Sequence, residues 1–320
     1  MNTDILTQNL DLLVGQDQAK HLLSKCLTAG NCAAYLLAGP PHVGKGFLAR
    51  IMAASLHQEA NVYKIHPDTV IFDDILTKNS GENEENRWKQ SVDDFIHLIY
   101  LSPIISQVKI GIIENIDRFS TQALNALLKT LEEPPPRAVL ILTAEKETTV
   151  LPTILSRVQT IRLHYLSDAE IEEYLRGQEA ASGPEGAPAR WEKIAEITLL
   201  ANGAVGMANQ LAHNPKLLDR ALNGMNAFQT VLQKDIWQML QIANIKDRDE
   251  AIDLIQIWLN LSRRALIDKL GPSNSLKIAM QNYSPADLIK LIDRLKLALS
   301  SLEANANVRI TLESTVLSVI

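Results

Sequence analysis

Cysteine is scarce in this chain, which has only Cys26 and Cys32 among 320 residues. Two thiols are too few for a disulfide framework or for a zinc site with four cysteine ligands. No apolar stretch is long enough to span a bilayer. The opening segment, MNTDILTQNLDLL, lacks the basic-then-apolar pattern of a secretory signal. We therefore expect a cytoplasmic protein without zinc and without a membrane contact.

An excess of positive charge is missing as well. The 31 Lys and Arg residues are outnumbered by 37 Asp and Glu residues, which gives a formal net charge of -6. A protein that binds nucleic acid by itself usually carries a basic face strong enough to show in this total. Any contact with DNA is therefore expected to come from a local patch or from partner subunits. The 46% of hydrophobic residues excludes a disordered chain, and the length allows two or three domains.

The first half of the sequence alternates short apolar runs with helical patterns. Residues 18–28, 44–56, 92–101 and 120–131 predict helices, the last of them with Ser120 as its N-cap. Strands are predicted over 33–38, 68–72, 108–113, 138–142 and 159–163. Short apolar strands separated by helices are typical of a parallel sheet that is covered on both faces. This half is therefore expected to be an α/β nucleotide-binding fold.

The strand pattern stops after Leu166. Residues 167–211 predict two or three short helices around a loop over 177–190, which is rich in Gly, Pro and Ala. The chain after Asn214 is strongly helical, and Ser284-Pro285 is expected to open a helix over 288–302. Its apolar residues keep a helical period: Ile289, Ile292, Leu295, Leu299 and Leu302. We expect domains over 1–165, 166–213 and 214–320.

A glycine-rich loop lies between a predicted strand and a predicted helix. Its sequence is GPPHVGK, running from Gly39 through Gly44 to Lys45. In such a P-loop, backbone N–H groups and the helix N-terminus bind phosphate, and the lysine reaches the terminal phosphates. The next residue is normally Ser or Thr, whose hydroxyl holds Mg²⁺. Here it is Gly46, so the metal loses a protein ligand.

The acidic segment after the strand predicted at 108–113 also lacks a group that ATP hydrolysis needs. It reads Glu114-Asn115-Ile116-Asp117. Glu114 could serve a metal ion, but Asn115 cannot accept a proton and so leaves the general-base position vacant. The alternative is an ordinary acidic loop after a buried strand, which explains the two carboxylates without any chemistry.

A long motif suggests a family. Residues 120–135, STQALNALLKTLEEPP, resemble the A-x-N-A-L-L-K-x-L-E-E-P-P segment of clamp-loader subunits of bacterial DNA polymerase III, an AAA+ family. Glu132 and Glu133 fall at a predicted helix C-terminus, where the helix dipole disfavours negative charge. Such an uncompensated feature is expected at a functional site, although a solvated acidic turn would also explain it.

Shorter matches occur in the family's order along the chain. Val14-Gly15-Gln16 resembles the segment beside the adenine, and Thr143 stands at the sensor-1 position. Ser156-Arg157-Val158 resembles the Ser-Arg-Cys motif. A further match, to the ending of the family's collar domain, comprises Asn305-Ala306-Asn307 and Leu312-Glu313.

This resemblance implies an AAA+ domain, a helical lid and an all-α collar, and it is strongest to the delta-prime type of subunit. It implies gamma/tau and delta subunits as partners, and contact with the sliding clamp and primed DNA through the complex. Arg157 would act in trans as an arginine finger, whereas the alternative is a surface Arg that pairs with a local carboxylate.

Two more departures from the family pattern accompany the resemblance. The family's zinc module is missing between Leu56 and Asp68, and Met207 stands where sensor 2 supplies an Arg. Together with Gly46 and Asn115, this predicts weak ATP or ADP binding without hydrolysis. An active gamma/tau-type motor is the alternative, while a helicase loader or junction helicase would not explain the LEEPP and collar matches.

Overall fold

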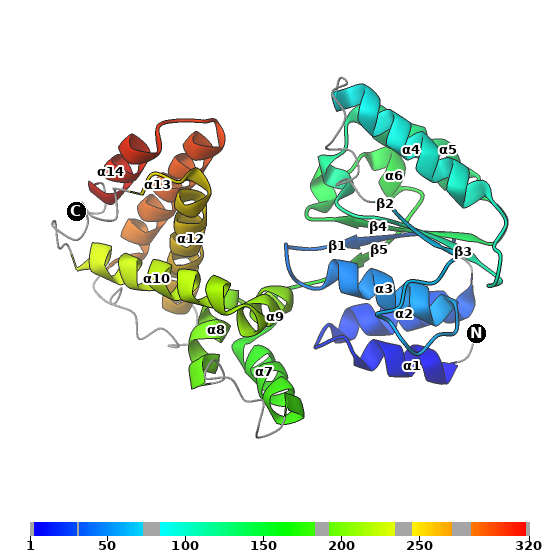
Figure 1. The fold of residues 1–320 in the computed structure, drawn as a ribbon, viewed down its shortest axis with the longest axis horizontal. Coiled ribbons are helices and arrows are strands. Elements are labelled where there is room, and N and C mark those ends of the chain that lie inside the picture. Colours follow the sequence, from blue (N-terminus) through cyan, green and yellow to red (C-terminus); the bar gives the residue numbers. More distant parts are fainter. Residues whose placement is uncertain are drawn as a thin grey trace. The chain divides into compact units, whose positions relative to one another are not determined.

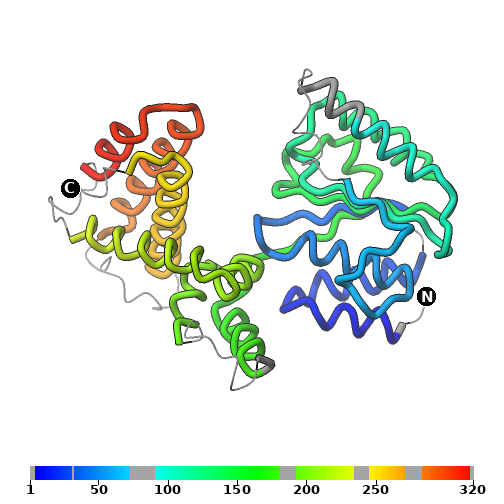
Figure 2. The backbone as a smooth tube through the Cα atoms, in the orientation of Figure 1, coloured from blue at the N-terminus to red at the C-terminus, as the bar shows by residue number. Residues whose placement is uncertain are grey.

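The computed structural model describes residues 3–30, 32–72, 84–182, 192–233, 245–270 and 283–317. The chain divides into two compact units, Met1–Glu170 with Ala204–Gly206, and Ile171–Gly203 with Met207–Ile320 (Figures 1 and 2). The first unit contains the described strands, and the second is built from helices. The finer division into a lid over 166–213 and a collar over 214–320 stays a prediction.

The N-terminal unit is built on a five-stranded sheet in which all neighbouring strands are parallel. The strand order is β2-β3-β4-β1-β5. The strands are β1 (Ala34–Ala38), β2 (Thr69–Phe72), β3 (Lys109–Ile113), β4 (Ala138–Ala144) and β5 (Gln159–Arg162). The sequence therefore predicted every one of these strands, and the parallel sheet is confirmed.

Helices cover both faces of this sheet (Figure 1). One face carries α1 (Thr3–Asp11), α2 (Asp17–Ala29) and α3 (Lys45–Leu56), and the other carries α4 (Glu84–Tyr100), α5 (Thr121–Glu132) and α6 (Pro152–Leu155). Successive strand residues point to opposite faces, so Leu37 joins the first core and Leu36 the second. This explains why every residue of β1 is apolar and buried.

The described part of the second unit consists of helices. They begin with α7 (Asp168–Ser182), most of which lies in this unit, α8 (Ile194–Ala201) and α9 (Val205–His213), as the sequence predicted. The others are α10 (Pro215–Leu232), α12 (Arg248–Leu270), α13 (Pro285–Glu303) and α14 (Val308–Leu317). Their shared core surrounds Trp258, whose indole N–H donates to the Gly224 carbonyl oxygen at 3.0 Å.

Two sequence predictions in this unit were wrong in detail. The loop predicted over 177–190 begins too early, because α7 continues to Ser182; residues 183–190 lie outside the described part of the chain. Gly177 costs this helix only about 1 kcal/mol, which the helix-favouring residues after it can offset.

The other error concerns Ile289, which is 50% exposed although it was placed on the apolar face of α13. The buried face starts one residue earlier, at Leu288, and continues through Leu291 and Leu295. The N-terminal signal of this helix is confirmed. Ser284 and Asp287 form a reciprocal capping box, with Pro285 in the first turn.

Candidate functional site

The GPPHVGK loop leaves the carboxyl end of β1, which lies between β4 and β5 in the sheet. The chain then crosses to the far side of β4, so the loop sits where the strand order changes direction. Ligands of open α/β sheets bind at such switch points, beyond the carboxyl ends of the strands. The predicted P-loop therefore has the setting that phosphate binding requires.

Gly44 ends this loop as the N-cap of α3, with φ of 101°, a conformation that favours glycine. Lys45 follows and is 7% exposed. Its ammonium group donates to the carbonyl oxygens of Gly39 and Pro40, both at 2.7 Å. Burial lowers the pKa of Lys45, against the opposing effect of nearby carboxylates. A phosphate would have to take this ammonium group away from the loop's own carbonyls.

The two expected metal-binding positions meet in space. A Cβ atom added to Gly46 would lie 2.9 Å from Oε1 of Glu114, the first residue after β3. The sequence predicted that these positions serve the same ion, and the structure brings them together. Gly46 supplies no oxygen there, so Glu114 is the one of the pair that can bind a cation.

Asn115 and Thr143 also meet beside the loop. The Asn115 backbone N–H donates to Thr143 Oγ1 at 2.9 Å, and Thr143 is 2% exposed. Asn115 has φ of 54° and ψ of 51°, a left-handed conformation that Asn adopts more readily than most residues. The predicted sensor-1 residue thus contacts the predicted base position, and an amide stands where a base would be needed.

Glu145 is a residue of this site that the sequence analysis missed. Its backbone N–H donates to Asp117 Oδ2 at 3.2 Å, and its carboxylate pairs with Arg118 at 3.0 Å. Among the carboxylates that raise the pKa of Lys45, Glu145 has the largest effect, followed by Asp117 and Glu114. Its position just after β4, the neighbour of β1, was the available signal. Three carboxylates therefore lie near Lys45, of which Glu145 is paired with Arg118.

The segment Val14-Gly15-Gln16 lies next to the P-loop. The Gln16 side chain makes two hydrogen bonds to the backbone of His164, at 2.6 and 3.1 Å. The preceding residue, Leu13, has its Cδ1 atom 3.7 Å from where a Cβ of Gly44 would lie. The neighbouring Leu13 therefore places the predicted adenine-side segment near the P-loop, while Gln16 itself binds the backbone after β5.

The predicted sensor-2 stretch reaches the loop through its backbone. The Gly206 N–H donates to the His42 carbonyl oxygen at 2.7 Å, and a Cβ on Gly206 would come within 2.8 Å of that oxygen. Burial lowers the pKa of the His42 side chain, and Lys45 lowers it further. His42 therefore adds no positive charge to the loop near neutral pH.

Comparison with known proteins bears on this arrangement. The family described as DNA polymerase III, delta subunit, matches residues 15–167, which contain the loop and the LEEPP segment. The DNA polymerase III subunit gamma of Buchnera aphidicola subsp. Acyrthosiphon pisum is 28% identical over 175 residues, 51% of this chain and 47% of that protein. The N-terminal half of this chain is thus similar to clamp-loader subunits of DNA polymerase III.

A second relative and a solved structure are also similar to this chain. The DNA polymerase III subunit tau of Escherichia coli is 28% identical over 177 residues, which cover 51% of this chain and 26% of that protein. The matches thus span about half the length of the first relatives, or less. A gamma subunit-related protein of Thermotoga maritima has a TM-score of 0.53 at 19% identity, covering 94% of this chain and 98% of that one. This last likeness shows the fold alone.

The LEEPP and Ser-Arg-Val motifs are in direct contact. Arg157 Nη2 lies 2.7 Å from Oε1 of Glu132, the last residue of α5. Arg157 Nη1 also donates to the Thr153 carbonyl oxygen at 2.7 Å and to Ser156 Oγ at 2.9 Å. Arg157 lies between α6 and β5. Its pairing with a local carboxylate is the contact that the surface-Arg alternative anticipates.

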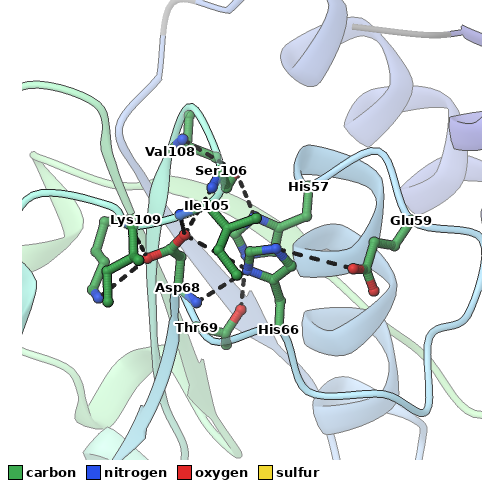
Figure 3. A network of polar contacts seen from close by, with 10 residues as sticks. His57, Glu59, His66, Asp68, Thr69, Ile105, Ser106, Val108 and Lys109 are labelled. Atoms are coloured by element: carbon green, nitrogen blue, oxygen red, sulfur yellow. Dashed lines mark hydrogen bonds and ion pairs between the residues drawn. The ribbon is translucent and has the colours of Figure 1, made fainter.

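The short stretch between Leu56 and Asp68, where the family's zinc module is missing, is held by a polar network (Figure 3). The rings of His57 and His66 stack with their centroids 3.9 Å apart. His57 also contacts Ser106 Oγ at 2.8 Å and Thr69 Oγ1 at 2.9 Å. Burial and the adjacent His66 lower the pKa of His57 to about 4.

Asp68 is the centre of this network and is completely buried. Its carboxylate accepts backbone hydrogen bonds from Ile104, Ile105 and Ser106 at 2.7 to 2.8 Å, and Lys109 Nζ lies 3.6 Å away. Burial raises the pKa of Asp68, but the three N–H donors and Lys109 outweigh it and hold the pKa well below its usual range. The carboxylate thereby fixes the loop that follows α4.

The described ranges contain no group of three His, Cys, Asp or Glu residues arranged to hold a metal ion. Cys26 and Cys32 are both free thiols. None of the described helices has the length and apolar character needed to cross a membrane.

In the C-terminal unit, the residues that resemble the collar ending have structural roles. Arg248 donates to the side chain of Asn305 and to the Ala306 carbonyl oxygen. Asn307 accepts a hydrogen bond from the Ile310 N–H at 3.1 Å and so caps the start of α14. The motif therefore forms the turn between α13 and α14.

Proposed function

We propose that this protein is a clamp-loader subunit of the delta-prime type that does not hydrolyse ATP. It assembles with gamma/tau and delta subunits in the cytoplasm, and the complex places the sliding clamp on primed DNA. Its own P-loop has a structural role, and Arg157 contributes to the ATP site of a neighbouring subunit.

The position of Asn115 carries this proposal. The sequence resemblance assigns Asn115 to the general-base position, and its backbone N–H contacts Thr143, the predicted sensor-1 residue, which supports that assignment. Its amide cannot take a proton from water. Gly46, next to Glu114, removes a metal ligand at the same place. Loss of the general base alone would prevent hydrolysis, and loss of the metal ligand removes a second requirement.

The electrostatics of the loop support weak nucleotide binding at most. The ammonium group of Lys45 is already satisfied by two loop carbonyls. Three carboxylates lie near enough to affect its pKa: Glu114, Asp117 and Glu145. A triphosphate would meet this negative charge without the full set of ligands for a compensating Mg²⁺. Bound ATP or ADP would be held through the loop backbone and would stay intact.

The exposed guanidinium of Arg157 supports a role in trans. A partly exposed ion pair contributes only about 0 to 1 kcal/mol, so Glu132 can yield Arg157 to a phosphate at little cost. A guanidinium is permanently charged and presents a fork of donors that matches phosphate oxygens. Arg157 can therefore neutralise the charge that develops on a neighbour's γ-phosphoryl group.

An active gamma/tau-type motor is the second candidate, and one observation favours it. The curated relatives that match this chain are themselves gamma and tau subunits. A motor of this type would hydrolyse ATP by itself in the presence of Mg²⁺, whereas the proposed subunit would not.

The test of the trans role is Arg157→Ala in a reconstituted loader in which only the adjacent motor site is competent. An arginine finger contributes about 10³ to 10⁵ in turnover, equivalent to about 4 to 7 kcal/mol of barrier. The matched control is Arg162→Ala, which removes another exposed Arg that pairs with a carboxylate, Glu147 at 2.7 Å. Assembly is checked separately. A loss of less than about tenfold in an intact complex would exclude the role.

A further inference from the structure

The guanidinium of Arg157 makes three polar contacts with neighbouring residues. Its guanidinium contacts Glu132, the Thr153 carbonyl oxygen and the Ser156 hydroxyl, all within 2.9 Å. Ser156 Oγ in turn donates to the same Thr153 oxygen at 3.1 Å, so its position is fixed as well. The Nη1 atom is therefore held by the Thr153 carbonyl oxygen and the Ser156 hydroxyl, and the Nη2 atom is held by Glu132.

The backbone that carries these groups is also fixed. Ile154 of α6 is fully buried in the core beneath α5, and the Arg157 N–H donates to its carbonyl oxygen at 2.9 Å. Glu132 is the last residue of α5, and the Glu133 N–H closes that helix on Lys129 O at 2.9 Å. Both partners of the ion pair therefore extend from rigid elements of one unit.

The pair also resolves an anomaly in the sequence. A carboxylate at a helix C-terminus is unfavourable, because the last carbonyl groups already carry partial negative charge. Here the guanidinium of Arg157 lies 2.7 Å from Glu132 and adds a positive charge to that of Lys129 in the last turn. Glu133 follows directly, is exposed and caps the helix through its backbone alone in the described structure. Of the two acidic residues of LEEPP, Glu132 therefore pairs with Arg157, and Glu133 caps the helix.

We infer that Glu132 is a positioning residue for Arg157. It orders the guanidinium before a partner arrives, so that the arginine enters the neighbour's ATP site with its rotamer already selected. The inference rests on the proposed trans role of Arg157. Arg has many rotamers, and ordering them in advance lowers the entropic cost of reaching the transition state. Ser156 and the Thr153 carbonyl oxygen retain part of this order when Glu132 is removed.

The expected effect of Glu132→Ala in the reconstituted loader is a loss of about fivefold in the neighbour's kcat, with KM for ATP unchanged. The loss is far smaller than that expected for Arg157→Ala, because the charge itself remains. Glu132→Gln keeps an oxygen acceptor and should recover part of the activity. Glu133→Ala is the matched control, since it removes the adjacent carboxylate and leaves the ion pair intact.

A double-mutant cycle separates positioning from a general structural role. If Glu132 acts through Arg157, adding Glu132→Ala to the Arg157→Ala variant causes no further loss of turnover. If the losses multiply, Glu132 supports the fold or the assembly instead, and the inference is wrong. It is equally overturned if Glu132→Ala has no more effect than Glu133→Ala while Arg157→Ala still abolishes turnover. If Arg157→Ala itself has no effect, the proposed trans role fails and the inference fails with it.

Discussion

Asp68→Asn is the substitution whose consequence follows most directly from the structure. The buried carboxylate accepts three backbone hydrogen bonds, each within 2.8 Å, and lies 3.6 Å from Lys109 Nζ (Figure 3). The Asn amide retains one oxygen, but its NH₂ group would face a backbone donor, and Lys109 would lose its counter-charge. Breaking a buried pair of this kind costs about 3 kcal/mol or more.

Hydrogen exchange of the whole chain, measured by mass spectrometry, can detect this destabilisation in individual peptides. Peptides that cover β2 and β3 should exchange about a hundredfold faster in Asp68→Asn if they open with the N-terminal unit. The matched control is Asp94→Asn, which changes an exposed carboxylate of α4 and should stay within about 0.5 kcal/mol. An effect of Asp68→Asn no larger than that of Asp94→Asn would refute the account of the network.

The pH dependence of this effect has a definite sign. The pKa of Asp68 is lower in the folded chain than in the unfolded one, so its contribution to stability is present above the usual carboxyl pKa. That contribution is lost as the pH falls below about 4. The difference between the wild type and Asp68→Asn should therefore shrink in acid.

Three further predictions concern the same unit and its loop. The isolated Gly46→Ser protein should show no ATP turnover, because a restored hydroxyl leaves Asn115 without basicity; sustained Mg²⁺-dependent turnover would contradict this. The purified protein should contain no stoichiometric zinc, and elemental analysis that finds about one zinc per chain would defeat that expectation. Because the folded pKa of His57 is lowered to about 4, stability should fall as the pH drops below about 6.5, by about 1 to 2 kcal/mol at pH 5. Exchange rates of His57→Gln that keep the full wild-type pH dependence would argue against it.

Much of the fold followed from local patterns in the sequence. The three central strands β1, β3 and β4 are apolar at nearly every position and almost wholly buried, as expected in a parallel sheet covered on both faces. The sequence predicted the caps at Ser120 and Ser284 from the residue type. In the structure each of these side chains accepts a hydrogen bond from a backbone N–H group in the first turn of its helix. Helix α1 was missed, although Leu6 and Leu10 lie at helical spacing and are both buried.

Other features depended on contacts that no local pattern reveals. Glu132 and Arg157 are far apart in the sequence and meet only because α5 and α6 pack on the same face of the sheet. Glu145 joins the site for a similar reason, since β4 and β1 are neighbours only in the folded sheet. Ile289 was assigned to the buried face because a helical period alone does not show which of two adjacent apolar residues, Leu288 or Ile289, faces the core.

The decisive measurement is steady-state ATP turnover with Mg²⁺, by the purified chain alone and by the loader assembled with it. The account predicts no turnover above the blank for the chain alone, and turnover by the assembled complex that requires Arg157. Turnover by the isolated chain at about 1 s⁻¹ or faster, the range of ordinary enzymes, would contradict it and identify the protein as a motor subunit.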